Sequence, residues 1–331
     1  MKELVIFGTD DKKTICLVED EELVEKYEED ENNKSIEGNI YIGKVQNVIT
    51  GLQSAFVNIG EKRNAFIHVK DILPKVDIKK KKKLEEKNIN ELIKPGDPII
   101  VEVKKEAVDK KGPRLSTHIT LTNRFVVFMP NSNFITVSQK IENNAERERL
   151  KEIVQKYLPE GSGAIIRTVA ENKPEEELKN DISKTIEKWK AIQNISIDEI
   201  PQKIYDKGGV LKKTIVDLVD NKLDKIVLND KKDLSLIKNI LDEIEADVKI
   251  EIDNEILNKY NLLKQIQATE SNKVWLKSGG FITIDKTEAL VAIDVNSGKF
   301  IGKKDVEETI TKVNLEAAKE ISKQLRLRDI S

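Results

Sequence analysis

Two polar residues at the end of one apolar run could bind a metal ion. The run 289–293 is entirely apolar, and Asp294 and Asn296 follow it. Residues two apart point to one face of a strand, and oxygen ligands on one face suit Mg²⁺, which needs only one or two carboxylates together with substrate phosphate. A carboxylate there is also costly to desolvate unless it meets a cation or donors. On spacing alone, a simpler role is favoured, in which Asp294 caps the turn at Asn296-Ser297-Gly298.

Two phenylalanines could bind nucleic acid by stacking. Phe56 and Phe66 fall on neighbouring predicted strands, and single-strand-binding barrels present aromatic rings worth about 1–3 kcal/mol per stacked base. The alternative is that both rings belong to a core, which is the commoner position of a strand phenylalanine. Basic residues that could attract phosphates lie at Lys44, Lys62, Arg63 and Lys105.

A third candidate is Arg167-Thr168, which ends the apolar strand 164–166. A guanidinium beside a hydroxyl can bind a phosphate from two directions. An ordinary surface arginine at a strand-to-loop junction explains the same pattern.

The histidines and the cysteine indicate no further site. His68 and His118 are the only histidines, and neither has a partner at metal-ligand or catalytic spacing. The single Cys16 excludes an intramolecular disulfide and a cysteine-clustered zinc site within this chain, and we expect it to pack in a core. The sequence contains no glycine-rich phosphate loop.

Composition limits the class of protein. The chain has 331 residues, a net charge of −2, 35% charged and 38% hydrophobic residues, which predicts two or three folded domains rather than a disordered or uniformly basic chain. No signal-peptide core and no run of about 20 apolar residues is present. We therefore expect a soluble, cytoplasmic protein.

The elements that must position these residues fall into blocks. Short strands at 4–7 and 14–18 precede an acidic stretch, and the α/β alternation of 206–255 is expected to complete them, because two short strands cannot fold alone. Between these segments, five glycine-punctuated strands at 40–48, 55–59, 65–68, 99–104 and 115–121 predict a small barrel. The lysine run Lys79–Lys83 interrupts the barrel and is interpreted as a solvated loop.

Two further blocks follow the barrel. Residues 122–205 predict a strand pair at 125–129 and 134–137, a helix at 145–158, a strand at 163–169 and a helix at 174–195. The last block predicts a hairpin of 281–284 with 289–295. A helix then starts at a capping-box-like Asp305 and runs to about 328.

Taken together, these segments resemble the RNase E/G family of bacterial endoribonucleases from Met1 to the last residue. The strongest stretches are Ser278–Gly280, Ile284–Leu290, Ile293–Ser297, Asp305–Thr309, Asn314–Ala318 and Gln324–Asp329. In the barrel, Asn39–Tyr41, Gly43–Val45 and Ala55–Val57 resemble the family's S1 domain, and Gly163–Val169 resembles its 5′-sensor segment.

The resemblance implies roles for individual residues. It implies that Asp294 and Asn296 are catalytic, with Asp294 as a Mg²⁺ ligand. The implied RNA-binding residues of the S1 domain are Phe56, Phe66, Tyr41, Lys44, Lys105 and Lys111. The implied pocket for a 5′-monophosphate consists of Arg167, Thr168 and Val127.

The resemblance also implies an α/β and α+β multidomain fold. An RNase H-like domain (1–36 with 206–270) would be interrupted by an S1 domain of OB fold (37–121) and a 5′-sensor domain (122–205). The start of a DNase I-like catalytic domain (271–331) would follow.

Departures from the family pattern bear on activity. The family's second metal-binding aspartate and its zinc-linking cysteine motif lie beyond residue 331, so we expect an N-terminal fragment or a truncated homologue, with homo-oligomers only in a longer form. Gln139 stands where the family commonly has arginine.

The expected function is Mg²⁺-dependent cleavage of single-stranded, AU-rich RNA in rRNA and mRNA processing and decay, with 5′-monophosphate sensing. The alternative is a non-catalytic S1-type module that binds single-stranded RNA. A structural scaffold without an RNA role is a third possibility.

Overall fold

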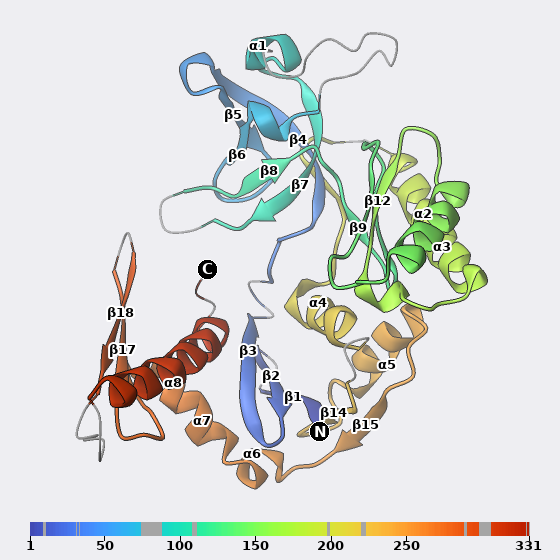
Figure 1. Cartoon of the computed structure of the whole chain (residues 1–331). Coiled ribbons are helices and arrows are strands. Elements are labelled where there is room, and N and C mark those ends of the chain that lie inside the picture. The colour runs from blue at the N-terminus through green and yellow to red at the C-terminus, as the bar shows by residue number, and fades with distance from the viewer. Residues whose placement is uncertain are drawn as a thin grey trace. The chain divides into compact units, whose positions relative to one another are not determined.

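Two stretches far apart in the sequence build one compact unit, and the chain between them builds another. The first unit comprises residues 1–33 and 222–331, and the second comprises residues 34–221. The computed structural model (Figure 1) describes residues 1–8, 11–30, 32, 34–73, 88–107, 111–196, 199–219, 223–287, 290–297, 306–328 and 330, with the backbone alone for 306–309. The predicted loop Lys79–Lys83, the turn residue Gly298 and the helix start Asp305 lie outside the described residues.

In the first unit, the N-terminal strands join strands from late in the chain. The sheet has the order β15-β14-β1-β2-β3, in which β1, β14 and β15 are parallel and β1, β2 and β3 are antiparallel. The strands are β1 (Lys2–Gly8), β2 (Lys12–Glu19), β3 (Glu22–Asp30), β14 (Lys225–Leu228) and β15 (Lys249–Ile252). The register joins Val5 to Val227, so this sheet requires residues more than 200 positions apart.

The acidic segment after β2 is a strand, which its sequence did not predict. β3 pairs with β2 along its whole length, although only two of its nine side chains are buried. Cross-strand ion pairs such as the diagonal pair Lys12–Glu28, at 2.6 Å, join its carboxylates to lysines of β2. Pairing with β2 therefore supplies the stabilisation that the local apolar pattern lacks.

Helices pack beside this sheet. They are α5 (Leu234–Glu243), α6 (Ile256–Lys259) and α7 (Leu262–Glu270). One core cluster joins Val5, Cys16 and Val227 of the sheet with Tyr260 and Leu262. Cys16 is fully buried, as expected, and burial raises the pKa of its thiol to about 12.

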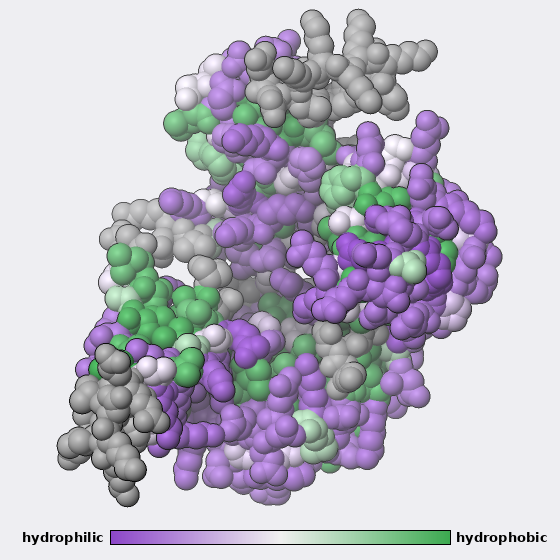
Figure 2. All heavy atoms as spheres, viewed as in Figure 1, coloured by the Kyte–Doolittle hydropathy of each residue, from purple (hydrophilic) through white to green (hydrophobic). Residues whose placement is uncertain are grey.

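The last segment is a three-stranded sheet with one long helix, rather than the predicted hairpin with a helix. β16 (Lys273–Trp275), β17 (Phe281–Lys286) and β18 (Val291–Asn296) form an antiparallel sheet in that order, and α8 spans Val306–Leu327. Ile282 and Ile284 pack with Val313 of α8. Hydrophobic side chains also gather on the surface over β17, β18 and α8 (Figure 2). Ile310 of α8 is 47% exposed.

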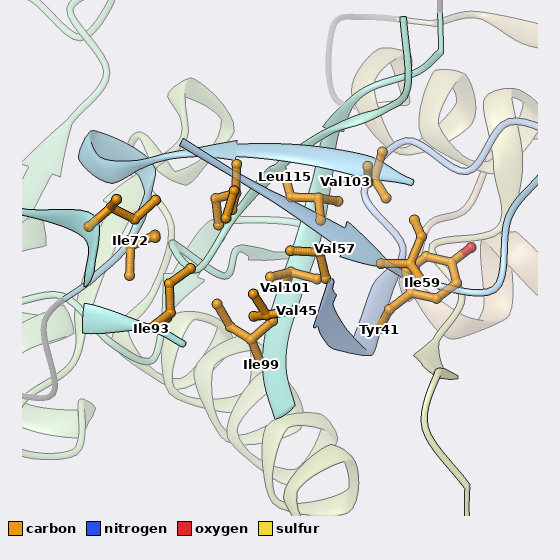
Figure 3. Close-up of a cluster of buried hydrophobic side chains, with 14 residues drawn as sticks. Tyr41, Val45, Val57, Ile59, Ile72, Ile93, Ile99, Val101, Val103 and Leu115 are labelled. Carbon is orange, nitrogen blue, oxygen red and sulfur yellow. The ribbon is translucent and has the colours of Figure 1, made fainter. Parts of the chain in front are cut away.

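The second unit contains a closed barrel. Its strands are β4 (Ile40–Ile49), β5 (Ser54–Asn58), β6 (Ala65–His68), β7 (Pro98–Lys105) and β8 (Arg114–Ser116), with the short helix α1 (Ile89–Leu92) before β7. The strand order is β4-β5-β6-β8-β7, and β7 pairs back onto β4, which closes the barrel. Inward residues such as Val45, Val57 and Val101 fill the interior (Figure 3).

The structure corrects two details of the predicted barrel. The expected strand at 115–121 is two strands, β8 and β9 (Leu121–Thr122), in different sheets. The chain turns between them because Thr117 N–H and the Ser116 and Thr117 hydroxyls donate to the Asp71 carbonyl. In addition, β13 (Gln202–Tyr205) pairs with the outer edge of β4, which no local pattern indicated.

A second sheet and two helices follow the barrel in this unit. The sheet order is β11-β12-β10-β9, with β10 (Val126–Met129), β11 (Ile135–Val137) and β12 (Gly163–Ile166). The predicted pair of 125–129 with 134–137 is wrong, because β12 lies between these strands and pairs with both. Gly163 permits this close approach, since a Cβ there would lie 2.3 Å from the Phe134 carbonyl oxygen.

The helices of this part are those that their periodicity predicted. They are α2 (Asn144–Tyr157) and α3 (Glu175–Gln193), and α4 (Gly209–Leu218) belongs to the same unit. The Asn143 side chain caps α2 by accepting from the N–H groups of Ala145 and Glu146. No helix in the described ranges combines the length and the apolar character needed to cross a membrane.

Candidate RNA-binding and catalytic sites

The aromatic pair of the barrel lies on the outer face of neighbouring strands. Phe56 of β5 and Phe66 of β6 are directly opposite each other in the antiparallel register. Their ring centroids are 6.1 Å apart at 68°, an edge-to-face arrangement. Both side chains are half-buried, whereas Val57 and Ile67 on the alternate face are fully buried. The rings are therefore outside the core and accessible to a ligand.

The same row continues across the barrel with polar and basic residues. Asn47 of β4 is opposite Phe56, Arg114 of β8 is opposite Phe66, and Lys105 of β7 is opposite Arg114. Asn47, Arg114 and Lys105 are exposed, and Arg114 is held by Asp71 at 2.9 Å. Side chains directly opposite one another share a face of the sheet, so the strand register assembles an aromatic centre with cations at one end.

The other predicted lysines of the barrel are also on its surface. Lys44 is exposed on β4, opposite Asn58 of β5. Lys111 is exposed directly before Gly112, whose Cα passes so close to Asn64 that a Cβ would lie 2.1 Å from the Asn64 carbonyl oxygen. This contact brings Lys111 beside the exposed loop that carries Lys62 and Arg63.

Tyr41 is a correction to the predicted RNA-binding set. Its side chain is 4% exposed and lies in the barrel core with Val45 and Val101 (Figure 3). Tyr41 and Val45 are four residues apart in β4, so they share the inner face, opposite to Lys44. The buried ring cannot stack on a base, and burial raises the pKa of its hydroxyl.

The predicted phosphate site at Arg167 and Thr168 is tied to its surroundings. The Arg167 guanidinium donates to the carbonyl oxygens of Asn123 (3.1 Å) and Arg124 (3.2 Å) and pairs with Asp217 at 3.0 Å. The Thr168 hydroxyl shares a 2.8 Å hydrogen bond with the Ser138 hydroxyl. Arg167 is thus held rigidly. One of its partners is the Asp217 carboxylate, and a phosphate would have to displace this carboxylate to bind the guanidinium.

The remaining residues predicted around this site lie on two neighbouring segments. Val127 is half-buried on β10, opposite Ile165 of β12 and Thr122 of β9. Gln139 is exposed next to Ser138. Arg147 of α2 holds this segment, because its guanidinium donates to the carbonyl oxygens of Ser138 (2.6 Å) and Ile141 (2.9 Å).

A buried carboxylate, which sequence reasoning missed, organises the turn that holds Arg167. Asp181 of α3 is 6% exposed and accepts hydrogen bonds from the N–H groups of Arg124, Phe125 and Val126 at 3.1 to 3.2 Å. Burial raises the pKa of Asp181 to about 6, although these hydrogen bonds and Arg167 oppose the shift. The available signal was its place between Leu178 and Ile182 on the apolar face of the helix.

In the first unit, Asp294 and Asn296 lie on the face of β18 that points away from α8. The alternate residues Ile293 and Val295 pack toward the core shared with α8. Asn296 Nδ2 donates to Asp294 Oδ2 at 2.7 Å, so the amide orients the carboxylate. Asp294 itself is exposed. The turn-capping alternative involves Gly298, which lies outside the described residues.

The residues present fit a weakly held Mg²⁺ ion but not a complete protein cage. Within the described ranges, no three His, Cys, Asp or Glu side chains converge on one point. Mg²⁺ usually retains several waters and uses one or two carboxylates together with substrate phosphates. One exposed, oriented carboxylate meets that minimal requirement only with a phosphate present.

Comparisons with known proteins establish the family. A sequence profile of the Ribonuclease E/G family matches residues 120–331, and one of the S1 RNA binding domain matches residues 34–118. Ribonuclease G of Haemophilus influenzae is 37% identical over 99% of this chain and 69% of its own length. The chain belongs to the ribonuclease E/G family.

Other members of the ribonuclease E/G family give the same result. Ribonuclease G of Escherichia coli K12 is 34% identical over 99% of this chain and 69% of its own length. Ribonuclease E of Nostoc sp. PCC 7120 is 34% identical over 96% of this chain and 48% of its own length. The family resemblance seen in the sequence is therefore confirmed, and it is a family of endoribonucleases, which are hydrolases of RNA.

The S1 match of this ribonuclease E/G family member coincides with the closed barrel. Residues 34–118 contain β4 to β8 and both outward-facing phenylalanines, Phe56 and Phe66. Asn47 and Arg114 are the residues of the row that sequence reasoning missed. The place of Arg114 directly before the apolar Leu115 was a sequence signal for an outward strand residue, but only the register placed it beside Phe66.

Proposed function

We propose that this protein is an endoribonuclease that binds single-stranded, AU-rich RNA on the S1 barrel and cleaves it at a site built around Asp294. The observation that carries the proposal is the hydrogen bond from Asn296 to Asp294 on the solvent-facing side of β18. It presents one oriented carboxylate on an open surface, in a chain of the ribonuclease E/G family. rRNA and mRNA would be the substrates, in processing and decay.

Support for the RNA-binding part comes from the row Asn47–Phe56–Phe66–Arg114–Lys105. Single-strand binding without strict sequence preference combines stacking on aromatic rings with a basic track for the backbone. The edge-to-face pair offers ring surface for bases, while Arg114 and Lys105 provide positive charge in the same row. The net charge of −2 is compatible with this, because binding needs only a local basic face.

Asp294, oriented by Asn296, would hold the Mg²⁺ ion. A bound Mg²⁺ supplies Lewis-acid activation of water and of a phosphate oxygen. The task of Asn296 is to keep the Asp294 carboxylate in one orientation through its side-chain amide. The exposure of Asp294 leaves room for a phosphate beside the carboxylate.

Preference for a 5′-monophosphate would come from Arg167, Thr168 and Val127. The guanidinium is fixed by two carbonyl oxygens, so little conformational entropy is lost when it binds an anion. The Thr168 hydroxyl, one residue away, supplies a second donor. Asp217 would have to yield its ion pair to the incoming phosphate.

Within the multidomain arrangement, we also propose names for the parts. The sheet of β1 to β3 with β14 and β15 would be the RNase H-like domain, and the β9–β12 sheet with α2 and α3 would be the 5′ sensor. The β16–β18 sheet with α8 would be the start of the DNase I-like catalytic domain.

The test is a comparison of binding and cleavage with 5′-monophosphorylated, fluorescent, AU-rich single-stranded RNA in Mg²⁺. Asp294→Asn should abolish cleavage and retain binding. Asp242→Asn is the matched control, because Asp242 is an exposed carboxylate of α5, outside the β16–β18 sheet. Equal activity of Asp294→Asn and the wild type would contradict the proposed catalytic site.

One observation favours the alternative of an RNA-binding module without catalysis. Among the described residues, no three metal-ligating side chains converge, so Asp294 is not part of a complete set of protein ligands for a metal ion. Under this alternative, the wild-type chain binds the RNA and leaves it intact at every Mg²⁺ concentration. Failure to bind RNA at all would instead contradict the S1 assignment.

A further inference from the structure

A second aromatic pair lies on the same sheet as Asp294. Trp275 of β16 and Phe281 of β17 are directly opposite each other, with ring centroids 5.3 Å apart at 61°. Lys273 Nζ lies 4.1 Å from the centroid of Trp275 and 3.6 Å from that of Phe281. The arrangement is an edge-to-face pair with an ammonium group over both rings.

The strand register places this pair beside the proposed catalytic residues. Asn296 is opposite Phe281, and Asp294 is opposite Thr283, two residues further along β17. Residues directly opposite share a face, and diagonal neighbours are about 7–8 Å apart. Phe281 is therefore a diagonal neighbour of Asp294 on the surface that points away from α8.

The exposure of the pair is unusual for structural aromatic residues. Trp275 is 65% exposed and Phe281 is half-buried, whereas Val274 and Ile282, on the other face, pack with Leu276 in the core beneath. The sheet thus places its aliphatic residues inward and its aromatic residues outward. The indole contributes little to this core and remains accessible to a stacking partner.

We propose that Trp275 and Phe281 form a stacking platform for a base of the RNA strand next to the phosphate held at Asp294. A nucleotide is the occupant that fits, because the flat face of its base matches the indole and its negative phosphate is attracted by Lys273. Stacking of one base on an aromatic ring is worth about 1–3 kcal/mol. The platform would act as a positioning device that fixes the nucleotide beside the cleavage point.

This inference rests on the proposed function, and Trp275 provides its own reporter. The chain has two tryptophans, Trp189 and Trp275, so Trp189→Phe leaves Trp275 as the single tryptophan, which can be excited at wavelengths where tyrosine does not absorb. Oligouridine should quench this variant strongly. The matched variant Trp275→Phe, which keeps only the half-buried indole of α3, should change little on addition of the same RNA.

A binding measurement on the same samples separates the two proposals. Fluorescence anisotropy of labelled oligouridine reports binding by the whole chain. Binding without quenching of Trp275 would overturn the platform and leave the proposed function intact, whereas the absence of any binding would overturn both. Resistance of Trp275 to acrylamide before RNA is added would show that another protein surface covers it, and would also overturn the platform.

A substitution tests the stacking contribution directly. Trp275→Ala should weaken binding of a short oligouridine by about 5- to 150-fold in a Phe56→Ala background, where the barrel contributes less. Trp275→Phe, which keeps an aromatic ring, should restore most of the affinity. Leu290→Ala is the control, because Leu290 is 60% exposed before β18 in the same sheet. An equal loss in Leu290→Ala and Trp275→Ala would contradict stacking.

Discussion

Asp181 and Arg167 bind consecutive backbone groups of one turn. The Asp181 carboxylate accepts from the N–H groups of residues 124–126, while the Arg167 guanidinium donates to the carbonyl oxygens of residues 123 and 124. A buried carboxylate and a guanidinium thereby satisfy opposite ends of the same peptide groups. The position of Arg167, and with it any phosphate site there, depends on a residue of α3 that does not reach the surface.

This relationship predicts a pH-dependent stability. The pKa of Asp181 is raised to about 6 in the folded state, from 3.8, so the folded protein binds this proton more tightly than the unfolded chain. The contribution of Asp181 to the free energy of unfolding is therefore largest below about pH 4 and is lost as the pH rises through about 6. Urea unfolding as a function of pH measures it.

Asp181→Asn should remove that pH dependence and also destabilise the fold. The amide cannot accept from three N–H groups, and an unsatisfied buried donor costs about 1–3 kcal/mol. Asp217→Asn, at an exposed carboxylate, is the control and should keep the pH dependence. A parallel pH profile for Asp181→Asn and the wild type would refute this assignment.

Asp217 should limit the response to a 5′-phosphate. Asp217→Asn removes the negative charge that pairs with Arg167 at 3.0 Å, so the guanidinium becomes freer to bind phosphate. We expect a higher ratio of affinities for 5′-monophosphorylated over 5′-hydroxyl RNA, measured by competition binding. Thr168→Val should lower the same ratio, since it removes a hydroxyl donor. An unchanged ratio in both variants would place the sensor elsewhere.

Substitutions at two aromatic positions of the barrel should change different properties. The change at Phe56 should lower RNA affinity, and the change at Tyr41 should lower folding stability. Phe56→Ala removes a half-buried outer ring and should weaken RNA binding by about 1–3 kcal/mol with the fold retained. Tyr41→Ala removes a ring from the core and should cost about 3–5 kcal/mol of folding free energy, as for other large core side chains. Titration calorimetry with RNA and thermal unfolding distinguish the two effects. Similar stability losses in both variants would contradict the outward position of Phe56.

Lys105 should contribute to RNA affinity through its positive charge alone. Lys105→Ala removes one exposed cation from the row beside Arg114. Neutralising one phosphate contact should reduce the slope of log K against log salt by about 0.7 for a single strand. Lys94→Ala, at an exposed lysine just before β7, is the comparison and should leave the slope unchanged. A salt dependence equal to that of the wild type would remove Lys105 from the RNA path.

Local sequence determined those features of the molecule that depend on neighbouring residues. The two-residue spacing placed Asp294 and Asn296 on one strand face. The periodicity of 174–195 predicted α3, in which Leu178 and Ile182 are buried. Family motifs identified the ribonuclease E/G family from the residues themselves. These properties follow from the periods of strands and helices, which a short window contains.

The tertiary structure decided what depends on pairing between distant strands. The local pattern favoured a core position for Phe56 and Phe66, whereas barrel closure placed both outside and buried Tyr41. The tertiary structure also brought Arg114 to Phe66 and placed β12 between β10 and β11. In the β16–β18 sheet, it aligned Trp275 with Phe281, and Phe281 with Asn296. The physical reason is that register and strand order are set by the burial of whole faces and by backbone hydrogen bonds between segments far apart in the chain, which no local pattern encodes.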